Sequence, residues 1–377
     1  MSFNQAKLLT LTSRNNAGEV IDKTYWGSGG ELLYTCSREA MPSDFSNFPA
    51  HKRTTEVDLL LTRNGRPYIH KPLVNSIYSN VVQRISIKPD NCRDFVRYAL
   101  ESEVVNFEAQ GVSIPSFNFG MWGSLRIPHP PLPTQIAIAN FLDRETAKID
   151  ELIANLEKLI ALLKEKRQAV ISNAVTKGLN PNAKMKDSGI DWIGEIPEHW
   201  EVVPLKKLIR VASGKDTKSD NGNFPLHGAN GIIGTCEAPT LAGGEVLIGR
   251  VGSAGAVNRT TGPSGASDNV LIVDCRNIDQ DFSYWLLTAC KLSEGVSTNA
   301  QPLITGTYIH NLRFPAPRIH DEQREISRYL AGETSSIDTS SELCARLVSL
   351  LKEKRAALIS AAVTGQIEIA ETTGEAA

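Results

Sequence analysis

The chain has 377 residues, of which 41% are hydrophobic and 22% are charged, and its formal net charge is −2. This composition is typical of a soluble globular protein with two or three domains, and so small a net charge neither requires nor excludes nucleic-acid binding. No apolar run approaches the roughly 20 residues that a membrane helix needs, and the N-terminus lacks the order of a secretory signal, so we expect a cytoplasmic protein without membrane contact.

The first globular part is predicted to be a small mixed α/β unit. The short apolar runs 59–62 and 81–87 are bounded by turn residues and predict strands, and residues 95–100 predict a helix. The turn TRNGRP follows the first of these strands. Four side chains in this turn and just after it are candidates for DNA contacts: Arg63, Asn64, Arg66 and Lys71.

A proline-rich joint then leads into a long helical segment. Residues 145–177 contain neither Gly nor Pro. Their apolar residues recur at alternating steps of four and three, as the a and d positions of a coiled coil require. The predicted seam comprises Ile149, Ile153, Leu156, Ile160, Leu163, Arg167, Val170 and Ala174.

The second globular part follows a linker at 177–208 and is also predicted to be mixed α/β. Residues 246–248 and 269–274 predict strands, and 282–292 predicts a helix. The stretch GRVGSAG at 249–255 is neither a dinucleotide fingerprint nor a phosphate loop, and a β-turn explains its glycines. Ten residues of this part are candidates for DNA contacts: Lys215, Lys218, His227, Asn230, Arg250, Asn258, Arg259, Asn299, Gln301 and Tyr308.

The chemistry of these candidates suits DNA. Arginine can pair with guanine, and asparagine or glutamine with adenine, through two hydrogen bonds, whereas lysine mainly contacts phosphate. Arg63 and Arg250 occupy equivalent positions in the two globular parts. For each residue a plain surface role is the alternative, and a structural salt bridge would also explain the matched arginines.

The chain is built from two copies of one unit. LLKEKRQAVISNAVT at 162–176 and LLKEKRAALISAAVT at 350–364 are identical at 12 of 15 positions, and residues 135–176 match 323–364 without a gap at 20 of 42 positions. Fainter matches continue upstream in the same order, such as DLLLTRNG with EVLIGRVG and FVRYAL with FSYWLL. Each copy is a globular part, a proline-rich joint and a long helix.

The second helical segment repeats the seam. Its positions are Ile337, Ser341, Cys344, Val348, Leu351, Arg355, Leu358 and Ala362. We expect Leu343, Leu347 and Leu350 to widen this poorer apolar stripe, and the two helices to pack on each other. Each helix keeps a Lys/Glu/Arg-rich outer face, which is either solvated or a docking surface for other subunits.

No motif for chemistry is present. The six cysteines contain no CxxC pair, and the chain has no Walker loop, HExxH motif or NPPY-type segment of an amino-methyltransferase. The PD at 89–90 is not followed by a convincing nuclease ExK. Binding without catalysis is therefore the better inference.

The chain resembles the specificity (S) subunit of type I restriction–modification systems. The resemblance is carried by PPLPTQIAIANFLDRETAKIDELIANLEKLIALLKEKRQAVISNAVTKGL (130–179), GIDWIGEIPEHWEVVPLKKL (189–208), EVLIGRVGSAG (245–255) and the second helical copy. It is strong over 125–255 and 310–365 and weak over 1–57. One departure is that the first copy lacks the WIGEIPEHW element of 192–200, so the first part is either shortened or closed differently.

The resemblance implies an α+β fold with two target recognition domains, each reading one half of a split DNA site, and two long helices that form an antiparallel coiled coil between them. The implied parts are a first recognition domain (1–130), a first helical spacer (131–178), a second recognition domain (179–318), a second helical spacer (319–366) and a disordered tail (367–377).

The implied partners are double-stranded DNA, two methyltransferase (modification) subunits and restriction/translocase subunits. S-adenosylmethionine, ATP and Mg²⁺ would belong to these partners, so we expect no cofactor, no metal and no catalytic residue in this chain. Three alternatives remain: an independent methyltransferase or nuclease, a coiled-coil scaffold without DNA binding, and an anti-restriction or half-specificity protein without its own choice of target.

Overall fold

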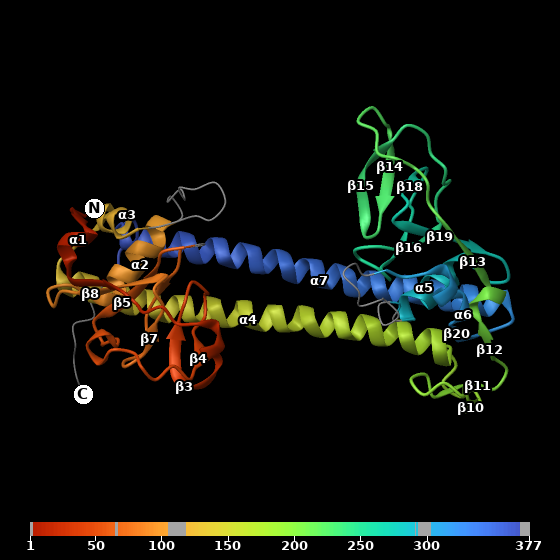
Figure 1. Ribbon diagram of the computed structural model, residues 1–377, viewed down its shortest axis with the longest axis horizontal. Helices are drawn as coiled ribbons and strands as arrows, with labels where there is room; N and C mark the ends of the chain where they lie inside the picture. Colours follow the sequence, from red (N-terminus) through yellow and green to blue (C-terminus); the bar gives the residue numbers. More distant parts are fainter. Residues whose placement is uncertain (1–2, 65–66, 105–117, 291, 293–302, 370–377) are drawn as a thin grey trace. The chain divides into compact units, whose positions relative to one another are not determined.

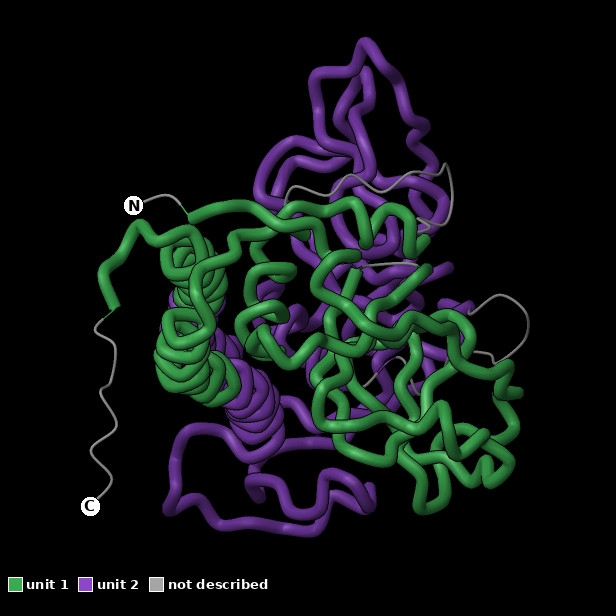
Figure 2. The backbone as a smooth tube through the Cα atoms, turned by 90° about the vertical axis from the view of Figure 1, so that its left-hand side faces the viewer, with its two compact units in different colours: residues 1–156, 346–377 green, residues 157–345 purple. Residues whose placement is uncertain are grey.

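The computed structural model describes residues 3–64, 67–104, 118–290, 292 and 303–369. The chain forms two compact units (Figure 2): unit 1 comprises residues 1–156 and 346–377, and unit 2 comprises residues 157–345. Both unit boundaries fall inside long helices. Each unit therefore contains one globular part and one end of each long helix.

Unit 1 is built on a four-stranded antiparallel sheet of order β2-β8-β5-β6, with smaller sheets of order β4-β3-β7 and β1-β9. Its short helices α2 and α3 are labelled in Figure 1 and precede strand β9 in the sequence. The elements are β1 (Gln5–Lys7), α1 (Leu8–Leu11), β2 (Thr12–Ala17), β3 (Trp26–Tyr34), β4 (Met41–Ser43), β5 (Asp58–Thr62), β6 (Ile69–His70), β7 (Ile77–Tyr78), β8 (Val82–Ile87), α2 (Arg93–Val104), α3 (Phe119–Ser124) and β9 (Arg126–Pro128).

Unit 2 has a four-stranded antiparallel sheet of order β13-β19-β16-β17, with smaller sheets of order β15-β14-β18, β12-β20 and β10-β11. The elements are β10 (Met185–Asp187), β11 (Glu195–Pro197), β12 (Glu201–Pro204), β13 (Ile209–Ser213), β14 (Phe224–Gly228), β15 (Gly231–Cys236), β16 (Val246–Gly249), β17 (Val257–Arg259), β18 (Gly265–Ala266), β19 (Val270–Cys275), α5 (Gln280–Ala289), α6 (Gly306–Asn311) and β20 (Arg313–Ala316).

The two units share one topology. The sheets β2-β8-β5-β6 and β4-β3-β7 of unit 1 correspond strand by strand to β13-β19-β16-β17 and β15-β14-β18 of unit 2. In each small sheet the middle strand pairs in parallel with a two-residue strand, β7 in one unit and β18 in the other. The predicted α+β class and the pseudo-repeat of the mixed units are confirmed.

The predicted strands and helices form because their apolar residues enter the cores. Every residue of β5 and β16 is buried, as expected for a central strand covered on both faces. Phe95 of α2 and Phe282 of α5 are equivalent and almost fully buried. Helix α5 ends at Ala289, three residues before the predicted end at 292.

A repeated glutamine ties each short helix to the long helix that follows. The Oε1 atom of Gln135 accepts a hydrogen bond from the backbone N–H of Cys92 (2.9 Å), and its Nε2 donates to the carbonyl of Pro130 (2.8 Å). Gln323 makes the same pair of bonds with Asp279 (2.7 Å) and Pro317 (2.8 Å). Because both side chains are buried, these bonds fix the joint between globular part and helix.

The two long helices are α4 (Leu132–Lys177) and α7 (His320–Val363). They pack antiparallel, because the start of α4 meets the end of α7 in unit 1, where Ile149 and Ile153 form a cluster with Val348. In unit 2 the end of α4 meets the start of α7, where Ile171 and Leu330 share one core. The predicted antiparallel coiled coil is confirmed.

The seam positions are the covered positions of these helices. Between residues 151 and 170, the residues that are not exposed are Ile153, Leu156, Ile160, Leu163, Arg167 and Val170. Between residues 339 and 358 they are Ser341, Cys344, Val348, Leu351, Arg355 and Leu358. The expectation that Leu343, Leu347 and Leu350 widen the stripe is wrong, because all three lie outside the seam with about half of their surface exposed (55%, 48% and 59%).

The units differ at their edges. Strand β1 pairs with β9 in unit 1 as β12 pairs with β20 in unit 2, so β1 and β12 are equivalent strands. The β10–β11 hairpin precedes β12 in unit 2, and the adjacent Trp200 is buried and donates from Nε1 to Glu322 (2.9 Å). Ile367 and Ile369, which were expected in a disordered tail, pack against the core of unit 1.

Within the described residues, no helix is both long enough and apolar enough to cross a membrane.

Candidate nucleic-acid interface

Arg63 and Arg250 lie at the same point of the two units, directly after the central strands β5 and β16. The Arg63 backbone N–H donates to the carbonyl of Val81 (2.8 Å), and that of Arg250 donates to the carbonyl of Asn269 (2.8 Å), so both are anchored beside the start of the neighbouring strand. Their guanidinium groups donate to neutral oxygens, the carbonyl of Asn80 (3.3 Å) and the hydroxyl of Ser213 (3.2 Å).

Neither arginine has a carboxylate partner among the described residues. The described part of the chain thus offers no structural salt bridge to account for the matched arginines. Both side chains are half-buried and keep unneutralised positive charge at the turn. Such a guanidinium group can bind an anionic phosphate or donate hydrogen bonds to a guanine edge.

The β14–β15 hairpin holds a second group of candidates. Asn230 lies exposed in its turn, which is next to β16 and β17, and Lys215 and Lys218 are exposed on the segment that leads into the hairpin. The aliphatic part of Lys218 packs beside Gly234 of β15. In Figure 1 this hairpin extends away from α5. A β-ribbon that is preceded by cationic side chains has the shape of a groove-entering element.

Two residues of this hairpin were missed by the sequence reasoning. Ile232 and Ile233 are 65% and 50% exposed, next to Gly231, whose positive φ of 110° turns the chain. The sequence contained a signal for their exposure. Two adjacent β-branched residues in a short strand place one side chain on each face of the sheet. In a hairpin at the edge of the fold neither face is covered, so both side chains stay exposed.

Three candidates are partly or wholly inside the fold. His227 is buried in β14, and burial lowers the pKa of its imidazole, which favours the neutral form. Asn258 is half-buried and donates to the carbonyl of Ala229 (3.5 Å), which supports the hairpin turn. Tyr308 of α6 packs partly buried against the core of unit 2. Because these three side chains are partly or wholly buried, they support the surrounding loops from within the fold.

Other candidates are held by acidic neighbours or fall outside the described structure. Arg259 pairs with Asp281, and Lys71 pairs with Asp94 at 3.0 Å. Burial alone would raise the pKa of Asp94, but Lys71 and the neighbouring arginines together lower it. Asn64 is exposed. Arg66, Asn299 and Gln301 lie outside the described residues.

The coiled coil offers a second kind of surface. In unit 2, Leu159 and Leu162 of α4 and Leu343 of α7 are exposed; we call them the unit 2 leucine patch. In unit 1 the exposed leucines of the long helices are Leu152 of α4 and Leu347 and Leu350 of α7; we call them the unit 1 leucine patch. All six occupy c or g heptad positions, and an antiparallel pair brings the g edges of its two helices together.

No catalytic constellation emerges from the described residues. They contain no group of three or more His, Cys, Asp or Glu residues that could hold a metal ion. In unit 1, burial lowers the pKa of His70 to about 4, which favours the neutral imidazole.

Comparison with known proteins agrees with this geometry. Residues 197–343 match the family model of the type I restriction modification DNA specificity domain. The MjaVIII specificity subunit of Methanocaldococcus jannaschii is 24% identical over 332 residues, which cover 79% of this chain and 75% of that protein. The EcoprrI specificity subunit of Escherichia coli is 30% identical over 126 residues, 33% of this chain and 30% of that protein.

Solved structures show the same fold. A chain described in a study of complex assembly and conformational transition of the type I restriction–modification system aligns with a TM-score of 0.62 at 16% identity, covering 97% of this chain and 98% of its own. The S subunit from M. genitalium aligns with a TM-score of 0.50 at 18% identity, covering 96% of both chains. Residues 197–343 are therefore similar to the type I restriction modification DNA specificity domain, and the chain as a whole shares the fold of the S subunit from M. genitalium.

Proposed function

We propose that this chain is the DNA-recognition subunit of a type I restriction–modification complex and binds a double-stranded site in two halves, one half per unit. One observation carries this function: the same fold occurs twice on one chain, with the same anchored arginine turn but different loops around it. A shared scaffold with divergent loops suits two readers of different sequences.

The coiled coil supplies the docking surface in this proposal. Exposed apolar groups such as the two leucine patches are typical of protein interaction sites. Because Leu159 and Leu162 of one patch are equivalent to Leu347 and Leu350 of the other, the patches suit two copies of one partner, which we take to be the methyltransferase subunit. Restriction subunits would join this assembly. S-adenosylmethionine, ATP and Mg²⁺ would be bound by those partners, and this chain would contribute no catalytic group.

The test is co-expression with the methyltransferase subunit of the same system, followed by methylation mapping of the host DNA. We expect adenine methylation confined to a bipartite motif and lost when this chain is omitted. Methylation without any motif, or the same motif after both recognition units are exchanged for those of a relative, would contradict the proposal. Methylation or cleavage by the purified chain alone would support an independent enzyme instead.

A further inference from the structure

Unit 2 contains a pocket of about 430 Å³ where α5 meets the end of α4 and the start of α7. It holds one cationic group, Arg167, two carboxylates, Asp338 and Glu342, and two aromatic rings. Its described lining consists of Arg167, Tyr284, Trp285, Ala331, Thr334, Ser335, Asp338, Thr339 and Glu342. The pocket is open to solvent, and about half of the Asp338 side chain is exposed (49%).

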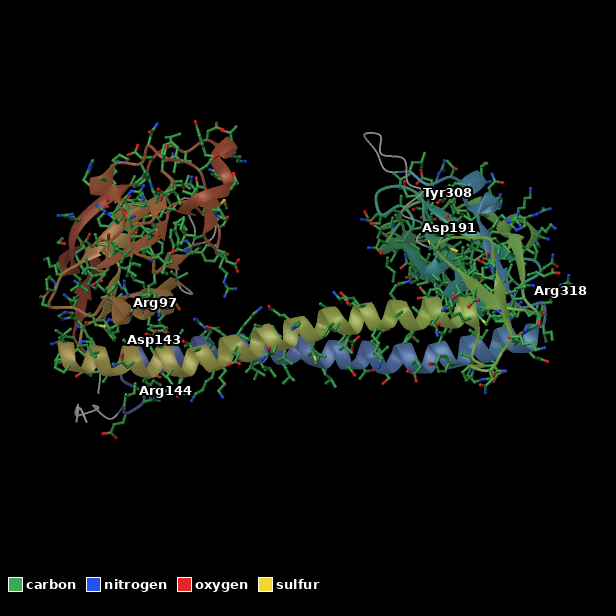
Figure 3. All side chains as sticks on the ribbon, turned by 90° about the horizontal axis from the view of Figure 1, so that it is seen from below. Arg97, Asp143, Arg144, Asp191, Tyr308 and Arg318 are labelled. Atoms are coloured by element: carbon green, nitrogen blue, oxygen red, sulfur yellow. The ribbon has the colours of Figure 1, made fainter. Side chains whose placement is uncertain are left out.

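The equivalent place in unit 1 is filled by the unit's own arginine. Arg97 of α2 lies with its guanidinium carbon 3.8 Å from the centroid of the Tyr98 ring. Its Nη1 donates to Glu101 (2.7 Å) and its Nη2 to Asp143 (3.1 Å). Figure 3 labels Arg97 and Asp143 on α2 and α4. The guanidinium therefore sits between an aromatic face and two carboxylates.

The residues around the pocket of unit 2 can be matched one by one with those around Arg97 in unit 1. Phe95 and Phe282 are buried at the same position of α2 and α5, and Gln135 and Gln323 bind the starts of these helices in the same way. In this register Tyr284 replaces Arg97, Thr288 replaces Glu101 and Ala331 replaces Asp143. In unit 2 Trp285 stands in the place of Tyr98, and the Tyr284 ring packs against it edge to face with centroids 4.8 Å apart, so α5 contributes two aromatic rings to the pocket and no cation.

We propose that the pocket of unit 2 receives an arginine or lysine side chain from a protein partner that docks on the coiled coil. Asp338 and Glu342 outnumber Arg167, so the pocket has an excess of negative charge that favours a cation. The rings of Tyr284 and Trp285 offer the faces over which a guanidinium stacks. The incoming side chain takes the role that Arg97 plays within unit 1.

This inference rests on the proposed function, because the partner is the methyltransferase subunit, and it implies that the two copies of that subunit are held by unequal sites. The site at unit 2 depends on a cation from the partner. The site at unit 1 presents a surface already closed by Arg97, Glu101 and Asp143. Two chemically identical partners then bind with different affinities.

Two variants test the pocket in the full chain. Glu342→Gln removes one carboxylate without adding bulk. The triple variant Tyr284→Arg, Thr288→Glu and Ala331→Asp installs the unit 1 network and closes the pocket. Glu151→Gln is the matched control, since Glu151 is an exposed carboxylate of α4 at the position equivalent to Thr339. Native mass spectrometry and calorimetry with the purified methyltransferase subunit give stoichiometry and affinity.

We expect two copies bound to the wild type, roughly tenfold weaker binding of one copy to Glu342→Gln, and a single bound copy on the triple variant. Glu151→Gln should match the wild type. Unchanged affinity of both copies for Glu342→Gln overturns the pocket but leaves the proposed function standing. A wild-type chain that binds no methyltransferase subunit overturns both.

Discussion

Arg167 of α4 and Asp338 of α7 form an ion pair across the coiled coil of unit 2, with Nε and Oδ1 2.9 Å apart. In unit 1 the pair Arg355 and Asp150 repeats this contact at the same 2.9 Å. Each arginine comes from the repeated KEKR stretch and each aspartate from the repeated ID dipeptide of the opposite copy. Each long helix thus supplies the arginine of one ion pair and the aspartate of the other.

These pairs predict a measurable coupling between the helices. In a double-mutant cycle with Arg167→Met and Asp338→Ala, we expect about 0.5–1 kcal/mol of coupling, because both side chains are partly solvated. The pair Arg355 and Asp150 should couple more strongly, since Glu101 also binds Arg355. Burial alone would lower the pKa of Arg355, but Glu101 and Asp150 raise it. Urea denaturation measures both cycles, and zero coupling in both would contradict the prediction.

Asp58, the first residue of β5, and Glu245, which directly precedes β16, occupy equivalent positions but should differ in their contribution to stability. Asp58 lies 3.8 Å from the buried Arg84, whereas Glu245 accepts bonds from Thr260 and the backbone of Ala242 and Gly243. Asp58→Asn leaves a buried guanidinium without its counter-charge, so we expect a loss of about 3 kcal/mol. Glu245→Gln loses only charge-assisted bonds, about 1 kcal/mol. Equal losses in chemical denaturation would argue against the buried ion pair.

His70 should make the stability of unit 1 depend on pH. Burial lowers its pKa from 6.5 to about 4. The unfolded chain therefore binds a proton between these values that the folded chain does not, so stability is full above pH 6.5 and falls as the pH drops toward 4, by roughly 3 kcal/mol. In urea titrations from pH 7 to 4.5, His70→Asn should flatten this slope, whereas the exposed His320→Asn should retain it.

The leucine patches should govern assembly with the methyltransferase subunit. Replacing Leu347 and Leu350 with glutamine removes exposed apolar surface without entering the seam, so folding should persist while partner binding weakens by at least tenfold. The same replacement of the equivalent pair, Leu159 and Leu162, should weaken the binding of the other copy of the methyltransferase subunit. Leu73→Gln, at an exposed leucine of unit 1 remote in sequence from both helices, is the control, and pull-down stoichiometry is the measurement.

Lys215 and Lys218 should contribute charge rather than sequence choice. The assembled complex carrying Lys215→Ala and Lys218→Ala should bind cognate DNA more weakly, with the slope of log K against log salt reduced by about 0.9 for each lost phosphate contact. The methylated motif should stay the same. Binding is measured by fluorescence anisotropy, with the exposed pair Lys206→Ala and Lys207→Ala as the control. An altered methylation motif would show instead that Lys215 and Lys218 read bases.

The sequence by itself determined the duplication, the α+β class and the coiled coil. These follow from local patterns: a seam with steps of four and three can bury its apolar side only against another helix, and short apolar runs between turns become central strands. The matched arginines also followed from the alignment of DLLLTRNG with EVLIGRVG. Repetition made each of these signals visible twice.

Only the tertiary structure decided which side chains are available for binding. His227 was a candidate for a DNA contact and is buried, and Leu343, Leu347 and Leu350 were expected to widen the apolar stripe of the seam and are exposed, because burial depends on what packs against an element. The crosswise pairs of Arg167 with Asp338 and Arg355 with Asp150 depend on antiparallel packing of segments 171 and 205 residues apart. No local pattern specifies a partner at that distance, since the contact exists only once the chain has folded.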